Sequence, residues 1–131
     1  MKKTIIKITA LTLVALMMCA MLASCGGPNA NPDKALESLK DNDYMAEKID
    51  STVGLLAFSF AGDVEAVVTG INKDADVVTI FYYSSAKAAN EAWDKVKEEA
   101  EEEKDDDSEL VIKKSGKMIY VGTKDAIKAA K

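Results

Sequence analysis

The stretch VEAVVTGINKDADVVTIFYY at residues 64–83 decides the fold. Its two outer segments, residues 64–71 and 76–83, are rich in valine, isoleucine, threonine and aromatic residues, which favour strands. Between them, Asn72-Lys73-Asp74-Ala75 has the composition of a turn. The stretch therefore predicts a β-hairpin. Alternation along its second strand sends Val78, Ile80 and Tyr82 to one face and Val77, Thr79, Phe81 and Tyr83 to the other.

The residues after this hairpin predict a helix, a second hairpin and a last short helix. Ser84 and Ser85 are good N-cap residues for a helix over residues 86–104, along which Ala89, Trp93, Val96 and Ala100 form one apolar stripe. Residues 110–113 and 118–121 are expected strands, joined by a turn in which Gly116 can take a positive φ. Thr123 is the expected N-cap of a helix over residues 124–130.

The residues before the hairpin are less decisive. Pro32 suits the first turn of a helix over residues 32–40. Residues 44–49 fit either a short strand or a continuation of that helix. Residues 53–60 are apolar, but the run is too short for its periodicity to separate a buried helical turn from a strand.

Together these elements predict an α+β fold in which a two-layer sandwich has an antiparallel sheet of about four strands, in two hairpins, with helices on one face. The other face of that sheet would then be open to solvent or to a partner. We expect at least one of Phe81, Tyr83 and Tyr120 to be exposed there and to form a binding face.

The composition limits the chemistry. The chain has 131 residues and no histidine, which removes Ser-His-Asp and Cys-His catalysis and most transition-metal sites. Its two cysteines, Cys19 and Cys25, both lie near the N-terminus, so no disulfide is expected in the domain. No cofactor and no metal site are predicted.

The first 24 residues have the order of a secretory signal. Three lysines in the first seven residues precede an apolar segment at residues 8–21, which is shorter than the roughly 20 residues of a membrane span. Residues 1–24 are therefore excluded from the fold. A plain secretory signal cut after Ala20 or Ala23, or an uncleaved short anchor, are the alternatives to the interpretation that follows.

The motif Leu22-Ala23-Ser24-Cys25 resembles the lipobox of bacterial prolipoproteins. The resemblance implies cleavage between Ser24 and Cys25, a diacylglyceryl group on the Cys25 thiol and, in many bacteria, a further acyl chain on the new amino group. Two acyl chains give a lasting anchor. The implied location is the extracytoplasmic side of the cell membrane, with a lipidated tether at residues 25–31 and one domain at residues 32–131. That domain resembles small uncharacterised lipoproteins of low-GC Gram-positive bacteria.

The mature chain would be acidic. Removing residues 1–24 leaves 14 lysines, no arginine and 22 carboxylates, a net charge of −8. Such a chain is not expected to bind nucleic acid or an anionic membrane by its charge. The acidic run at residues 98–107 lacks the spacing of a calcium loop and is interpreted as a solvated helix end.

Two short motifs suggest catalysis without completing a site. Residues 84–87 match S-x-x-K, and Lys114-Ser115-Gly116 is similar to the partner motif of penicillin-binding enzymes, but their middle element is missing. We therefore expect a non-enzymatic, lipid-anchored module that binds a protein or peptide partner. The alternative is a small envelope hydrolase or transferase that uses carboxylate or Ser/Lys chemistry.

Overall fold

The computed structural model describes residues 27–102 and 110–131. The signal segment, Ser24, Cys25 and the expected helix end at Lys104 lie outside these residues. None of the helices in the two ranges is both long enough and apolar enough to cross a membrane. The elements follow the chain in the order α2 (Pro32–Asp41), β1 (Met45–Ile49), α3 (Thr52–Leu55), the 3-10 helix η1 (Leu56–Ala61), β2 (Val64–Ile71), β3 (Val77–Tyr83), α4 (Ala86–Glu102), β4 (Val111–Ser115), β5 (Met118–Gly122) and α5 (Lys124–Ala129).

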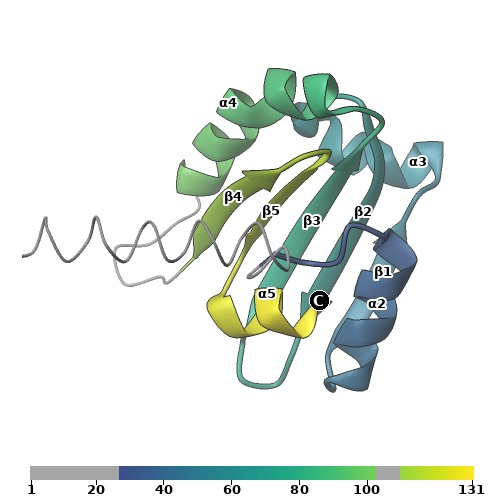
Figure 1. Cartoon of the computed structure of the whole chain (residues 1–131), viewed down its shortest axis with the longest axis vertical. Coiled ribbons are helices and arrows are strands. Elements are labelled where there is room, and N and C mark those ends of the chain that lie inside the picture. Colours follow the sequence, from purple (N-terminus) through teal and green to yellow (C-terminus); the bar gives the residue numbers. More distant parts are fainter. Residues whose placement is uncertain (1–26, 103–109) are drawn as a thin grey trace, which may run out of the picture.

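The α+β fold with an antiparallel sheet is confirmed, with five strands where about four were expected (Figure 1). The strands stand in the order β1-β2-β3-β5-β4, and every neighbouring pair is antiparallel. The extra strand is β1, which occupies the residues left open between strand and helix. The hairpin of residues 64–83 forms as predicted, with Val67 opposite Phe81.

Local capping explains where the helices begin. The Asn31 side-chain oxygen accepts the backbone N–H groups of Asp33 and Lys34, and Pro32 fills the first helical turn of α2, where its missing N–H costs nothing. The Ser85 hydroxyl accepts the Ala88 N–H at 3.1 Å at the start of α4. These side chains satisfy N–H groups that the first turn of a helix leaves without partners.

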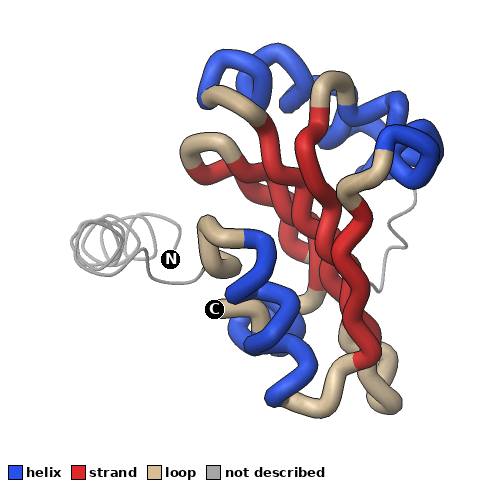
Figure 2. Tube along the Cα trace, turned by 90° about the vertical axis from the view of Figure 1, so that its right-hand side faces the viewer, coloured by secondary structure: helices blue, strands red, loops and turns tan. Residues whose placement is uncertain are grey.

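The prediction of helices on one face of the sheet is wrong, because helices lie on both faces (Figure 2). On one face, α2 and α5 pack against residues such as Val68, Ile80 and Tyr120. On the other, α4 and η1 pack against Val67 and Phe81. The central strands are apolar on both faces, and strands of that kind require cover on both. The protein therefore has three layers, with the sheet in the middle.

Two tight turns place residues in the left-handed backbone region. Ala75, in the turn between β2 and β3, has a φ of 64°, and Gly116, between β4 and β5, has a φ of 60°. A side chain is disfavoured in this region by about 1 to 2 kcal/mol, because Cβ approaches the following carbonyl oxygen. Only the second turn carries the residue that suits it.

Replacing Ala75 with glycine is therefore expected to raise the free energy of unfolding by about 0.5 to 1 kcal/mol. The reciprocal change, Gly116→Ala, is expected to lower it by about 1 kcal/mol through the backbone alone, since an added Cβ would meet no atom within 4 Å. Denaturant unfolding of both variants beside the wild type measures the two shifts. Shifts of the same sign would contradict this account of the turns.

Candidate binding surface

The three aromatic residues expected to form a binding face are buried. The exposed fractions of Phe81, Tyr83 and Tyr120 are 3%, 2% and 5%. The expectation that one of them is exposed is wrong, because the sheet has no bare face of the predicted kind. Phe81 lies between Phe58 and Phe60 of η1, with both ring pairs edge-to-face and their centroids 5.9 Å apart. The segment that covers Phe81 is the apolar run at residues 53–60 whose structure the sequence left open.

The buried tyrosines serve the fold through their hydroxyl groups. Tyr83 donates to the Ala61 carbonyl oxygen and Tyr82 donates to the Asn29 carbonyl oxygen, both at 2.7 Å. Burial raises the pKa of Tyr83 to about 12 and also raises the pKa of Tyr82 and of Tyr120. The Tyr82 and Tyr83 phenols are neutral hydrogen-bond donors inside the protein and are not placed to contact a partner.

An exposed surface does exist on the α4 side of the sheet, at the end away from α4. Two rows of paired residues cross the sheet there, and we call them together the open half-sheet. Its members are Met45, Ile71 and Val77 in one row and Glu47, Thr69, Thr79, Val121 and Ile112 in the next. The following row contains Val67 and Phe81, which η1 and α4 bury. Helix cover on this face, among the described residues, therefore reaches only part of the way along the strands.

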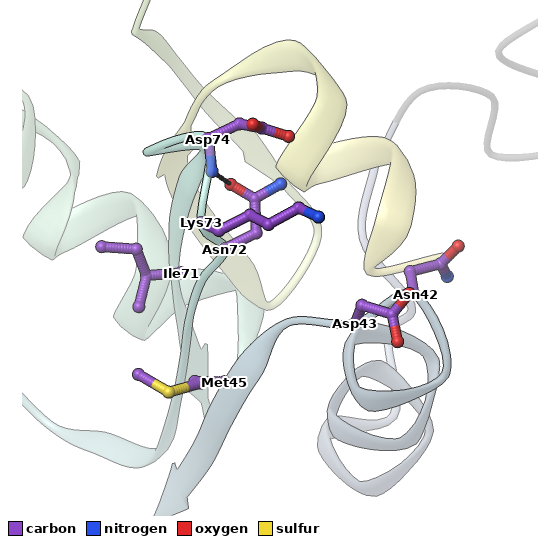
Figure 3. Close-up of a pocket in the computed structure, with 7 residues that line it drawn as sticks. All are labelled: Asn42, Asp43, Met45, Ile71, Asn72, Lys73 and Asp74. Atoms are coloured by element: carbon purple, nitrogen blue, oxygen red, sulfur yellow. Dashed lines mark hydrogen bonds between the residues drawn. The ribbon is translucent and has the colours of Figure 1, made fainter.

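Two apolar side chains stand out on the open half-sheet. Met45 is 77% exposed and Ile71 is 44% exposed, and they are direct partners across β1 and β2. Figure 3 shows both side chains on the same side of the sheet, at the edge of a hollow of about 600 Å³. Polar residues form the rest of its lining: Asn42, Asp43, Asn72, Lys73 and Asp74.

The rim of this hollow is built from two ordered turns. Asp43, directly after α2, has a φ of 66°, and its N–H donates to the Lys40 carbonyl oxygen at 3.1 Å. In the β2–β3 turn, the Asn72 side-chain oxygen accepts the N–H groups of Asp74 and Asp76 at 3.0 and 2.9 Å. Such bonds hold both turns in place, so the hollow is formed before any partner arrives.

A second, smaller hollow adjoins the open half-sheet. It has a volume of about 220 Å³ and lies between η1, α4 and the sheet. Its lining includes Phe58 and Phe60, together with Thr79 and Val121 of the open half-sheet. The open half-sheet therefore borders the side of η1 through Thr79 and Val121.

Strand β1 is an open edge next to this surface. In residues 27–102 and 110–131 it pairs with β2 alone. Every second residue of an antiparallel strand directs its N–H and C=O groups toward the same neighbouring strand. The Asn72 N–H donates to the Asp76 carbonyl oxygen at 3.1 Å, so the even-numbered residues of β2 bond to β3 and the odd-numbered ones bond to β1. By that alternation, the N–H and C=O groups of Ala46 and Lys48 point away from β2. They are free to bond to an added strand.

The candidate catalytic motifs are structural. Ser85 caps α4, and the Lys114-Ser115-Gly116 motif spans the end of β4 and the turn into β5. The two motifs share one end of the sheet, where the Tyr83 N–H donates to the Lys117 carbonyl oxygen at 2.8 Å. In the part of the chain that the structure describes, no three cysteine, histidine or acidic side chains gather as a metal site. The exposed apolar side chains of the open half-sheet suit binding better than a reaction.

Comparison of the chain with protein-family models, with curated proteins and with solved structures finds no match to any of them.

Proposed function

We propose that the protein is a lipid-anchored module on the extracytoplasmic side of the cell membrane that binds an extended segment of a protein partner. The anchor is Cys25, in the motif that resembles a lipobox. The binding surface is the open half-sheet together with the outer edge of β1. The observation that carries the proposal is the exposed apolar pair Met45 and Ile71 beside an edge strand with free hydrogen-bonding groups. Peptide segments that extend a sheet use both kinds of contact.

The charges around this surface favour a basic partner. Asp43, Glu47 and Asp74 stand on or beside the open half-sheet, and Lys73 is the one lysine in the lining of its larger hollow. A second copy of the chain fits poorly. Pairing two β1 strands so that Ala46 meets Lys48 would place Glu47 opposite Glu47, and like charges in that position are destabilising. The expected partner segment therefore carries apolar side chains flanked by lysine or arginine.

A photoreactive amino acid placed at position 71 of the lipidated protein, in its own membrane, tests this proposal. The same amino acid at position 53 is the control, because Val53 is 79% exposed but lies in α3, outside the open half-sheet. We expect an adduct from position 71 alone, joined to a segment of the expected composition. Equal adducts from both positions, or none from position 71, would refute the proposed surface.

Replacing Ile71 with serine should then weaken binding of that segment, made as a synthetic peptide, by about fivefold. Full burial of an exposed isoleucine side chain is worth roughly 2 kcal/mol, and binding can gain only the part that is still exposed, which is 44% for Ile71. The free energy of unfolding should fall by no more than about 1 kcal/mol, since Ile71 is only partly buried in the folded protein. Val53→Ser is the matched control and should leave affinity unchanged. A fall of about 2 kcal/mol or more in stability with no change of affinity would make Ile71 a core residue instead.

A further inference from the structure

The net charge of the chain hides a strong separation of charge. Residues 110–131 contain six lysines and one carboxylate, that of Asp125, so they carry a net charge of +5 within a mature chain of −8. Four of these lysines meet at one place. Lys113 of β4 and Lys124, Lys128 and Lys131 in and after α5 line a hollow of about 260 Å³ with Val111, Tyr120 and Ile127. We call it the lysine hollow.

Among the described residues, no carboxylate side chain lines the lysine hollow. The pKa of Tyr44 is raised first by burial and then by the nearby charges of Asp76, Asp125 and Asp74. Asp125 therefore stands close to Tyr44, at the C-terminal end of α2, and it does not line the lysine hollow. Within the part of the chain that the structure describes, the lining of the hollow therefore carries four lysines and no carboxylate side chain.

The start of the described chain lies at this same surface. A methyl group on Gly27 would be 3.5 Å from the Tyr120 hydroxyl oxygen, so the backbone passes directly beside the wall of the lysine hollow. Two residues on, the Asn29 N–H donates to the Ala130 carbonyl oxygen at 2.8 Å, and the Asn29 side-chain amide donates to the Lys131 carbonyl oxygen at 3.3 Å. Part of the expected tether is thus held against the domain. Figure 2 shows the N- and C-terminal ends of the described chain on one side of the sheet.

This placement limits where a lipid on Cys25 can be. Cys25 precedes Gly27 by two residues, and two residues of fully extended chain span at most about 7 Å. A lipid on Cys25 would therefore enter the membrane beside the lysine hollow. Lys113 is paired with Tyr120 across β4 and β5, and Tyr120 is paired with Ile80 across β5 and β3. Paired residues share a face of the sheet, and Ile80 belongs to the face that α2 and α5 cover, so the hollow is on the α5 side.

We infer that the lysine hollow docks on the anionic phospholipid headgroups of the membrane that holds the anchor. The inference rests on the proposed lipidation of Cys25. Lysines near an anionic bilayer each favour association about fivefold, and the anchor keeps these four within reach of the surface. Docking on this face turns the open half-sheet, which lies on the opposite face of the sheet, away from the membrane and toward a partner.

Chemical labelling of lysines on the lipidated mature protein tests the inference. The protein is bound to vesicles of phosphatidylcholine alone, or to vesicles with about a third phosphatidylglycerol, and treated with an amine-reactive reagent. We expect labelling of the four lysines of the hollow to fall about fivefold or more on the anionic vesicles, relative to Lys87 and Lys95 of α4, and to be unchanged on the neutral ones. In 1 M salt, where screening acts over about 3 Å, the protection should disappear.

Two triple variants separate docking from a general effect of charge. K124Q/K128Q/K131Q should abolish the protection of Lys113 on anionic vesicles, whereas K87Q/K95Q/K97Q, with the same net charge, should preserve it. In both variants the reference is Lys114, which lies outside the hollow and contacts Asn90 of α4. Labelling that is equal on both kinds of vesicle would overturn docking and leave the anchor standing. Failure of the wild-type protein to sediment with neutral vesicles would instead overturn the anchor, and protection on anionic vesicles alone would then still support docking.

Discussion

The protein with alanine in place of Cys25 is expected to accumulate as a precursor that retains residues 1–24 and carries no lipid. The thiol that would accept the diacylglyceryl group is then absent, and lipidation is what the implied peptidase requires before it cuts. Since each buried methylene contributes about 0.8 kcal/mol to membrane binding, loss of the acyl chains removes the lipid part of the anchor. Intact mass spectrometry of the purified protein measures both outcomes at once.

Cys19→Ala is the matched control, because Cys19 is the other cysteine and lies inside the apolar part of the signal. This variant should be cut and lipidated like the wild type. A wild-type protein that begins at Cys25 without the mass of a diacylglyceryl group, or that begins at another residue, would show that the motif at residues 22–25 is not a lipobox.

The segments with the strongest patterns could be predicted from sequence. The strand at residues 64–71 has the predicted limits, and α2 extends one residue beyond its predicted end. The reason is that their local preferences agree with their final environment: β-branched residues fill the central strands, and Pro32 suits the first turn of a helix. Positive φ at Gly116 is likewise a local requirement of its turn.

The arrangement of layers could not be predicted in the same way. Residues 53–60 have no clear period, and the 3-10 helix over most of them packs against Phe81, which is more than 20 residues away in sequence. Strand β1 is defined by pairing with β2 across the whole of α3 and η1. A further signal was nevertheless present, since Val67 and Val68 are both apolar although they point to opposite faces of β2. Apolar residues on both faces indicate a sheet covered on both sides.

The candidate binding surface could likewise be predicted from the sequence only in part. Aromatic residues suggested a binding face, but large aromatic side chains also fill cores, and Phe81, Tyr83 and Tyr120 do so here. Met45 lies in a segment whose structure the sequence left open, so its exposure could be found only once β1 was placed at the sheet edge. The lysines of residues 110–131 are visible in the sequence. Averaging the charge over the whole mature chain concealed them.

Replacing Gly122 with alanine is expected to lower the free energy of unfolding by about 3 kcal/mol or more. Gly122 pairs with Val78 across β5 and β3, and the next residue, Thr123, donates its N–H to the Val77 carbonyl oxygen at 2.9 Å. A Cβ at position 122 would lie 2.6 Å from that carbonyl oxygen and 2.9 Å from the Val78 Cα. Both atoms belong to the backbone of a central strand, so the clash can be relieved only by separating β3 from β5. For a domain of about 100 residues, this loss corresponds to a fall in melting temperature of about 12 to 24 °C.

Gly70→Ala is the matched control in the neighbouring part of the sheet. There the nearest atom to an added Cβ is a Leu39 methyl group at 3.1 Å, and the end of a leucine side chain can move by the few tenths of an ångström required. Alanine is otherwise favoured over glycine in a strand by about 0.5 to 1 kcal/mol, so Gly70→Ala should change stability by less than about 1 kcal/mol. Thermal unfolding of the two variants gives the comparison. If Gly122→Ala were as stable as the wild type, β3 and β5 could not approach each other as closely as this register requires.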